Sequence, residues 1–343
     1  MAISQEQIDD LARKGAERGA DLRPGLALVE ERLRTTVAAD LPFAETASRY
    51  LIDAGGKRFR PMLVLLTGML AGADPTDDRL VDAGVVVELV HLSTLYHDDV
   101  IDAADVRRGA PAAHVKWSNT VAILTGDFLL ARASELSAAL GVEVTRVMAR
   151  TIADLCAGQI REVQGSLAAR EHGAPAIEPT RDHYLTVIGE KTASLISASC
   201  RLGALLSHQS PEAVEVVTSY GWRLGMSFQL ADDVLDVIGE EGESGKLPGT
   251  DLHEGVRTLP VLLALEADGA TSPLPALLSD PTRTNVAAAL AILREHPGVE
   301  LARDAARLEA AKAKRVLSNL DDAAPAALEG LLYLADYAVH RVG

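Results

Sequence analysis

The stretch that decides the fold is residues 91–102, HLSTLYHDDVID, an apolar segment that ends in carboxylates. Residues 80–90, LVDAGVVVELV, precede it and supply enough apolar side chains for a buried helix. Asp98 and Asp102 are four residues apart and share one face of that helix, on which His91 lies two turns before Asp98. Carboxylates crowded at a buried helix end repel one another unless a cation binds, and without thiolate partners they suit a hard cation such as Mg²⁺.

The second half of the chain repeats this pattern in residues 229–236, QLADDVLD, again after an apolar run. One acidic cluster alone is equally typical of a solvated helix end, but two copies are more specific. Two such helices facing each other would form a cage for several Mg²⁺ ions, which proteins hold with a few carboxylates and substrate phosphates. The pair of motifs therefore predicts a phosphorylated or diphosphorylated ligand between the helices.

Composition favours an all-α fold. The chain has 343 residues, of which 48% are hydrophobic and 3% aromatic, and its many Ala, Leu and Val residues favour close-packed helices over a β-sandwich. We find no strand-like alternation, Gly-x-Gly-x-x-Gly, Walker-type loop or zinc-ligand spacing. We therefore predict a single all-α domain over residues 1–343, one large helical bundle whose active site is a central cavity between two Asp-rich helices. Residues 1–20 are expected to form a loosely attached N-terminal helix.

The hydrophobic period divides the chain into helices and loops. Helices are expected over residues 26–39, 62–70, 80–102, 120–140, 142–164, 184–206, 214–238 and 260–267, and two or three more over residues 284–342. Pro42 is expected near the start of a further helix, where proline is tolerated. Glycine, proline and charge mark loops at residues 103–111, 170–180, 239–255 and 273–281, of which 239–255 is a candidate lid.

The net charge of −16 argues against nucleic-acid binding and against an anionic membrane surface. An anionic ligand must then be attracted by local cations and bound metal. Cys156 and Cys200 both lie in apolar helical segments, which predicts two reduced core thiols. We find no signal-peptide pattern and no apolar run long enough to span a bilayer, so the sequence favours a soluble, cytoplasmic protein.

Cations occur at three places beside or within apolar segments. Residues 55–60, GGKRFR, place three cations between two apolar segments, which indicates a helix-capping basic turn or, as we favour, an anion site. Arg107 and Arg108 follow the first acidic cluster, so that a metal can take one side of a diphosphate while guanidinium groups take other oxygens. Lys191 interrupts an apolar helix, where a lysine either snorkels or has a function, and we favour a function.

Together these motifs resemble those of the trans-polyprenyl diphosphate synthases, also called isoprenyl diphosphate synthases. The resemblance runs from about residue 40 to the C-terminus, and its many agreements in order and spacing exclude chance. It rests on residues 55–61, the two Asp-rich motifs, Arg107-Arg108-Gly109, Gly126-Asp127, Lys191-Thr192, Phe228-Gln229, residues 251–255 and residues 258–260.

The resemblance implies a prenyl transfer. An allylic diphosphate would ionise to a carbocation, the double bond of isopentenyl diphosphate would attack it, and loss of a proton would leave a chain longer by one isoprene unit. The difficult step is the departure of pyrophosphate, which needs Mg²⁺ and cations where charge develops and no side-chain nucleophile. The family also implies a homodimer, and a greasy product would bring the protein into transient contact with a membrane on release.

Matching positions imply roles for individual residues. Those that would bind Mg²⁺ are Asp98, Asp102, Asp232 and Asp236. Those that would contact the allylic diphosphate are Arg107, Lys191, Thr192, Gln229 and Lys246. Those that would bind isopentenyl diphosphate are Lys57, Arg60, His91 and Arg108. The residues that would carry the reaction itself are Asp98, Asp102, Lys191 and Asp232.

The candidate lid departs from the family pattern. Many relatives carry a lysine at the position of Val256, which is followed here by Arg257, and a second lysine is frequent at the position of Thr250. The departure leaves open which lid cation closes over the diphosphate, but it does not change the reaction class.

Product length is expected to depend on two positions before the first Asp-rich motif. In the family, bulky aromatic residues there close the pocket and give short products, whereas this chain has Ser93 and Thr94. Helical geometry places Thr94 nearer the face of Asp98 and Asp102. Small residues imply an open channel and a product longer than geranylgeranyl diphosphate, for example a quinone side-chain precursor. The alternative is a geranyl, farnesyl or geranylgeranyl diphosphate synthase, in which a bulky residue from another helix stops growth.

Two other classes of protein share part of this pattern. A class I terpene cyclase has the first Asp-rich motif, but it usually replaces the second one and does not need the cations Lys57 and Arg60. A regulatory subunit of a heteromeric synthase typically loses the Asp-rich motifs, whereas this chain keeps both. Both alternatives are therefore less consistent with the sequence than the transferase.

Overall fold

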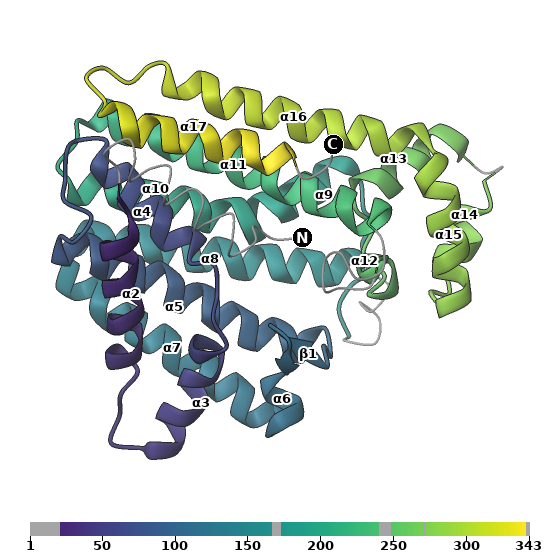
Figure 1. Cartoon of the computed structure of the whole chain (residues 1–343). Helices are drawn as coiled ribbons and strands as arrows, with labels where there is room; N and C mark the ends of the chain where they lie inside the picture. The colour runs from purple at the N-terminus through teal and green to yellow at the C-terminus, as the bar shows by residue number, and fades with distance from the viewer. Residues whose placement is uncertain (1–20, 167–172, 240–247, 270–271, 341–343) are drawn as a thin grey trace.

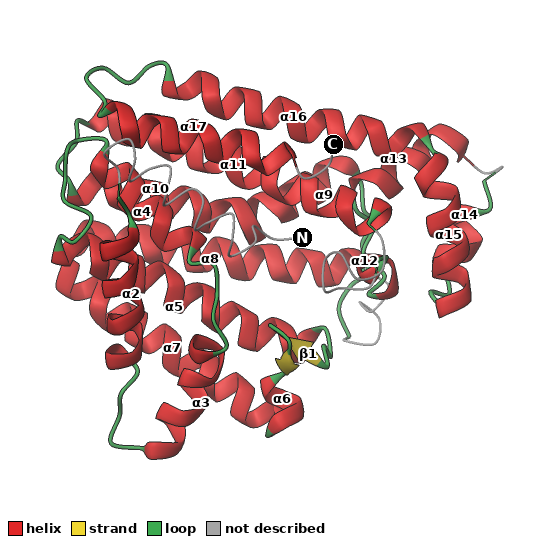
Figure 2. Cartoon of the chain, in the orientation of Figure 1, coloured by secondary structure: helices red, strands yellow, loops and turns green. Residues whose placement is uncertain are grey.

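The computed structural model describes residues 21–166, 173–239, 248–269 and 272–340. The helix expected within residues 1–20 and the predicted ligand Lys246 lie outside the described residues. Within the described residues the chain is a bundle of α-helices with one pair of two-residue strands, shown in Figures 1 and 2. The prediction of an all-α fold is confirmed.

The N-terminal half of the bundle is built around the helix that carries the first Asp-rich motif. That helix, α5 (Asp78–Ile101), is capped at its N-terminus by Asp77, whose side chain accepts hydrogen bonds from the N–H groups of Arg79 and Leu80. Its neighbours in sequence are α2 (Arg23–Thr36), α3 (Pro42–Asp53), α4 (Phe59–Met69), β1 (Val106–Arg107), β2 (Ala110–Pro111), α6 (Ala113–Lys116), α7 (Asn119–Leu140) and α8 (Val142–Gly165).

The C-terminal half is built around the helix that carries the second motif, α11 (Pro211–Ile238), which packs against α10 and α16. In Figure 1, α16 and α17 run along α11 on the side of the bundle away from α5 and α7. The remaining elements are α9 (Arg181–Ile188), the π-helical turn η2 (Gly189–Ala193), α10 (Ser194–Leu206), α12 (Thr250–His253), α13 (Leu259–Asp268), α14 (Leu274–Leu278), α15 (Arg283–Glu295), α16 (Pro297–Leu317) and α17 (Pro325–His340).

Two buried tyrosines tie these helices together. Tyr96 on α5 donates a hydrogen bond of 2.5 Å to the carbonyl of Ala47 on α3, and Tyr220 on α11 donates one of 2.7 Å to the carbonyl of Leu331 on α17. Both side chains are fully buried, so each phenol brings a large apolar surface into the core while its hydroxyl stays satisfied.

The structure corrects several sequence-based boundaries. The loop expected over residues 103–111 contains the β1–β2 pair, the described part of 239–255 contains α12, and 273–281 contains α14. Such short elements carry too few periodic residues to be found from a hydrophobic pattern. Pro42 is the first residue of α3, as predicted.

The expectation of two core thiols is half wrong. Cys200 is buried, but Cys156 is exposed on α8, where it lies on the outer face of an amphipathic helix rather than on its core face. Both cysteines are free thiols. Among the described residues, no helix has the combination of length and apolar character that is needed to cross a bilayer.

Candidate active site

The C-terminal ends of α5, α8 and α11 line a cavity of about 770 Å³. Nine residues that the sequence singles out are part of its wall: Lys57, Asp98, Asp102, Arg107, Lys191, Thr192, Gln229, Asp232 and Asp236. The bundle therefore brings both Asp-rich motifs to one cavity, as the sequence predicts. Arg60, His91 and Arg108 are not part of that wall and form a separate cluster, described below.

Asp98 and Asp102, the outer carboxylates of the first motif, lie on the cavity wall at the end of α5. Burial raises the pKa of Asp98 to about 6; Lys191 opposes this rise, and Asp102 and Glu162 add to it. Burial also raises the pKa of Asp102. Because burial makes both carboxylates resist ionisation, a divalent cation between them would favour the charged form of both.

Asp99, the inner carboxylate of the first motif, instead binds the side chain of Arg107. The side chain of Asp99 is fully buried, and its Oδ1 accepts a hydrogen bond of 2.6 Å from Nε of Arg107. Arg107 lies on β1 and lines the cavity. The Asp99 carboxylate therefore fixes one edge of the Arg107 guanidinium beside the site, as a charge-assisted hydrogen bond does.

Asp233, the inner carboxylate of the second motif, likewise binds a side chain of the cavity wall. Asp233 is buried, which raises its pKa. Its Oδ2 accepts the hydroxyl of Tyr184, and its Oδ1 accepts Nε2 of Gln229 at 2.8 Å. The hydroxyl of Thr192 donates to Oε1 of Gln229 at 2.9 Å. Four cavity-lining side chains thus form one hydrogen-bonded chain, which orients the Gln229 amide.

The outer carboxylates of the second motif differ from each other. Asp232 and Asp236 both line the cavity. The two oxygens of Asp236 accept the backbone N–H groups of Thr250 at 3.1 Å and Asp251 at 3.2 Å, at the start of α12. Asp236 therefore fastens α12 to the end of α11, with a lone pair of each oxygen already engaged.

Lys191 lies in the π-helical turn η2, a type of distortion that is frequent at functional sites. A Cβ on Gly158 of α8 would lie 2.7 Å from the backbone nitrogen of Lys191, so only glycine lets these two segments approach so closely. The Lys191 ammonium pairs with the Glu162 carboxylate. Burial lowers the pKa of Lys191, but Glu162, Asp98 and Asp102 together raise it, so the ammonium stays charged.

The carboxylates of the cavity can bind a hard divalent cation only if waters or substrate phosphates complete its coordination shell. Within the ranges that the structure describes, no three His, Cys, Asp or Glu side chains converge closely enough to hold one ion. Their donor atoms are oxygens, which Mg²⁺ prefers, and Mg²⁺ usually takes one or two carboxylates and completes its shell with waters and substrate phosphates. The residues therefore fit Mg²⁺ bound together with a diphosphate.

Arg60, His91 and Arg108 form a positively charged cluster. Burial lowers the pKa of Arg60 to about 10; Glu88 opposes this shift and Arg108 adds to it. Burial and both arginines lower the pKa of His91 well below its usual value, so its imidazole is neutral at pH 7. Nε of Arg60 is buried and has no hydrogen-bond partner among the described residues. An anion bound here would relieve the repulsion between the guanidinium groups.

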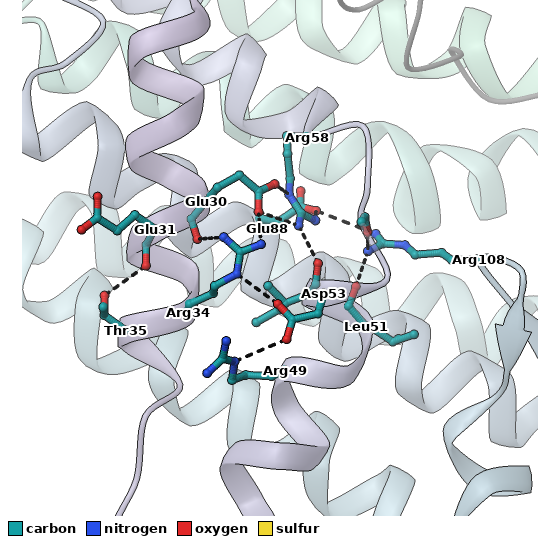
Figure 3. Close-up of polar contacts among 12 residues, drawn as sticks. Glu30, Glu31, Arg34, Thr35, Arg49, Leu51, Asp53, Arg58, Glu88 and Arg108 are labelled. Atoms are coloured by element: carbon teal, nitrogen blue, oxygen red, sulfur yellow. Dashed lines mark hydrogen bonds and ion pairs between the residues drawn. The ribbon is translucent and has the colours of Figure 1, made fainter.

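Arg58, which lies between Lys57 and Arg60 in the sequence, is paired with carboxylates. Arg58 is 4% exposed and is bound to the carboxylates of Glu30 and Glu88, as Figure 3 shows. The distance from Nη1 of Arg58 to Oε1 of Glu88 is 2.9 Å. The sequence does not reveal the partners Glu30, Glu88, Glu162 and Tyr184, because none of these side chains belongs to a local motif.

Comparisons with known proteins agree with this geometry. The model of the polyprenyl synthetase family matches residues 42–293. The chain is 44% identical over 327 residues to the nonaprenyl diphosphate synthase of Mycobacterium tuberculosis, covering 94% of each chain. It superimposes on a decaprenyl diphosphate synthase from Rhodobacter capsulatus with a TM-score of 0.85, at 32% identity and with 98% of this chain and 99% of that chain covered.

The chain belongs to the polyprenyl synthetase family. It is therefore a prenyltransferase, as the sequence predicts. A further solved relative, the geranylgeranyl pyrophosphate synthase of Corynebacterium glutamicum in complex with calcium and isoprenyl diphosphate, has a TM-score of 0.79 and 37% identity, with 95% of this chain and 98% of that chain covered. The family thus includes similar members whose products differ in length.

The two positions expected to control product length in this polyprenyl synthetase are placed differently. Ser93 is fully buried, whereas Thr94 is half-buried and its hydroxyl donates to the carbonyl of His91 at 2.8 Å. Neither residue lines the 770 Å³ cavity, although the next residue, Leu95, does. Their role in chain length remains a prediction.

Among the described residues of the candidate lid and the two that follow it, Val256 and Arg257, the one Lys or Arg on the cavity wall is Arg257. Its guanidinium pairs with the exposed carboxylate of Glu178. Thr250, where a lysine is frequent in the family, is the first residue of α12. Arg257 is thus the described lid cation beside the site, while Lys246 lies outside the described residues.

Proposed function

We propose that this chain condenses isopentenyl diphosphate with an allylic diphosphate and makes a polyprenyl diphosphate longer than geranylgeranyl diphosphate. The observation that carries the proposal is the pair of Asp-rich motifs on one cavity wall, with Lys191 and Arg107 beside them. The names of the M. tuberculosis and R. capsulatus relatives, which make nonaprenyl and decaprenyl diphosphate, support the long product.

The allylic diphosphate would bind in the cavity between the two motifs. Asp98 and Asp102 on one side and Asp232 on the other would hold Mg²⁺, which would supply Lewis-acid stabilisation of the departing pyrophosphate. Lys191 and Arg107 would bind its oxygens directly. Both cations are fixed by carboxylates, so they are positioned before charge develops in the transition state and need little reorganisation.

Isopentenyl diphosphate would bind at Arg60, Arg108, His91 and Lys57. The neutral imidazole of His91 would donate one hydrogen bond, and the two arginines would supply the charge. Lys57 lines the allylic cavity, so this cluster adjoins it, and the double bond can approach the allylic carbon. The pyrophosphate released in the first step would accept the proton that is lost after the attack, so the step would need no side-chain base.

We also propose that the active protein is a homodimer. Exposed apolar side chains gather on α6, α7 and the start of α3: Phe43, Val115, Ile123 and Leu124, with Leu41 just before α3. Both α3 and α6 pack on α7, and these helices lie on one side of the molecule in Figure 1. Leu124 is 61% exposed, and an apolar face of this kind favours a partner. Sedimentation of the wild type and of Leu124→Glu would test this, and a monomeric wild type would contradict it.

Product analysis tests the reaction. The purified protein is incubated with Mg²⁺, isopentenyl diphosphate and, separately, dimethylallyl, geranyl, farnesyl and geranylgeranyl diphosphates, and the alcohols are resolved by length after dephosphorylation. Products longer than geranylgeraniol are expected. Shorter products would retain the transferase and refute the long-chain proposal. Cyclic hydrocarbons would indicate a terpene cyclase, and the absence of elongation with every primer would indicate a regulatory subunit.

A further inference from the structure

We propose that Arg58 is a positioning residue that keeps the isopentenyl diphosphate site positively charged by holding Glu88 away from Arg60 and Arg108. The inference rests on the proposed function, because it explains how the site proposed for isopentenyl diphosphate keeps its charge. Arg58 itself would not touch the substrate.

Four hydrogen bonds join the guanidinium of Arg58 to protein partners. Nε and Nη2 bind the two carboxylate oxygens of Glu30, Nη2 also donates to the carbonyl of Ile52 at 3.1 Å, and Nη1 donates to Glu88 at 2.9 Å. Figure 3 shows Glu30 and Glu88 approaching the Arg58 guanidinium from two different helices. Arg58 also has a left-handed backbone, with φ of +46°, which is unfavourable for a residue with a side chain. The conformation therefore depends on the contacts that the guanidinium makes.

Glu88 is a single carboxylate shared by three arginines. It is 2% exposed, and its Oε1 lies 2.9 Å from Nη1 of Arg58 but 3.9 Å from Nη2 of Arg108. It also acts on Arg60, whose pKa it raises against the effect of burial. Glu88 thus lowers the cost of burying three like charges, and among the described residues Arg58 alone makes a hydrogen bond with it.

The position of Glu88 decides how much charge a ligand meets. With Glu88 and Glu30 bound to Arg58, Arg60 and Arg108 have no carboxylate at hydrogen-bond distance in this network. Without the Arg58 guanidinium, the buried carboxylate would need another donor, and Arg108 is 3.9 Å away. Arg108 and Glu88 already form an ion pair at 3.9 Å. Shortening it to a hydrogen-bonded pair would cancel more of the charge available to a diphosphate, and the site would then bind the anion more weakly.

Gly56 shows how tightly the two guanidinium groups are packed. A Cβ at this position would lie 2.6 Å from Nη1 of Arg58 and 2.9 Å from both Nη atoms of Arg108. Nη1 of Arg108 donates to the carbonyls of Leu51 at 2.7 Å and of Gly55. Two like charges therefore meet over one glycine, and the carboxylate of Glu88 forms an ion pair with each of them.

The test measures binding of isopentenyl diphosphate by calorimetry, with no primer and therefore no turnover. Replacing Arg58 with methionine should weaken this binding about tenfold, since a single Coulombic contact at a buried site is of that order. The double variant Arg58→Met/Glu88→Gln should restore binding to within about threefold of wild type, because no carboxylate is left to neutralise Arg108. The KM for the allylic primer should change less than about twofold in every variant that turns over.

Matched variants separate positioning from folding. Arg34→Met removes another arginine that lies 3.6 Å from Glu30 but does not touch Glu88, and should leave binding unchanged. Arg58→Lys, which keeps the charge, should fall between wild type and Arg58→Met. If the double variant binds no better than Arg58→Met, or if binding of the primer weakens equally, Arg58 acts only as a structural support and the proposal is wrong. Should Arg58→Met not fold, as judged by circular dichroism, the lysine variant and the double variant decide the question.

One further variant separates this inference from the proposed function. Arg60→Met should abolish measurable binding of isopentenyl diphosphate if the cluster is the site. If Arg60→Met binds as well as wild type, the location of the isopentenyl diphosphate site is wrong. If Arg60→Met loses binding while Arg58→Met keeps it, the site is right and only the positioning role of Arg58 is refuted.

Discussion

Asp99 and Arg107 form a hydrogen bond of 2.6 Å in which a fully buried carboxylate holds a cavity-lining guanidinium. Asp233 holds Gln229 at 2.8 Å in the same way on the facing helix. The two Asp-rich motifs are thus alike in structure as well as in sequence. In each, the inner carboxylate orients a side chain of the wall, and the outer carboxylates are left to line the cavity.

Asp99→Asn should reduce kcat/KM for the allylic primer about 10- to 100-fold. The amide can still accept a hydrogen bond, but it lacks the charge that fixes Arg107. Steady-state kinetics with saturating isopentenyl diphosphate measures the effect, and Asp105→Asn, which changes an exposed carboxylate nearby, should leave the rate unchanged. Wild-type kinetics in Asp99→Asn would show that Arg107 needs no anchor.

Asp98→Asn should lower kcat about 10²- to 10³-fold at saturating Mg²⁺, because one ligand of the ion on the leaving group is lost. The measurement is the initial rate of elongation over a range of Mg²⁺ concentrations. Asp98→Glu keeps the charge and should retain more activity than the asparagine variant. Turnover near the wild-type level in Asp98→Asn would refute the metal assignment of this residue.

The same Asp98→Asn variant should be more stable than wild type when metal is removed. The pKa of Asp98 is about 6 in the folded protein, above its unfolded value, so the folded state binds the proton more tightly. The contribution of the Asp98 carboxyl to the free energy of unfolding is therefore fully present below about pH 4, and it is lost as the pH rises through about 6. Denaturant unfolding in EDTA at pH 8 should favour the variant by on the order of 1–3 kcal/mol, and the difference should shrink as the pH falls. A variant less stable than wild type at pH 8 would contradict the origin of the shift.

Thr94→Phe should shorten the main product to geranylgeranyl diphosphate or less, because an aromatic ring one turn before Asp98 would fill the space that the growing chain needs. Resolution of the dephosphorylated alcohols measures the product length. Thr94→Val has nearly the volume of threonine and should give the wild-type product. If Thr94→Phe makes the same product as wild type, the channel passes elsewhere, and Ser93→Phe is the next variant to compare.

Tyr184→Phe should destabilise the protein by about 1–3 kcal/mol, since it removes the hydroxyl that binds the buried carboxylate of Asp233. The loss should also raise the KM of the allylic primer through Gln229. Tyr220→Phe removes another buried hydroxyl, whose partner is the carbonyl of Leu331, and should cost similar stability without changing that KM. Equal KM values in the two variants would show that the hydrogen-bonded chain is only structural.

The sequence by itself determined the all-α class, most long helices, and nine of the residues that meet at the cavity. It could do so because hydrophobic periodicity and the spacing of Asp98 to Asp102 are local properties, and a helix turns them into faces. The resemblance of the ordered motifs supplied the reaction. The short elements α12 and α14 and the exposure of Cys156 did not follow, because too few residues carry a pattern there.

Only the tertiary structure decided which of the like-charged residues are already paired. Arg58 and Arg60 are neighbours in one short stretch, yet Arg58 is bound by two carboxylates, from residues 28 and 30 positions away, whereas Nε of Arg60 has no hydrogen-bond partner among the described residues. Asp98 and Asp99 are adjacent, yet one lines the cavity and the other is buried against Arg107. The effective charge of a side chain depends on its burial and on which groups approach it in space, and neither is encoded in the local sequence.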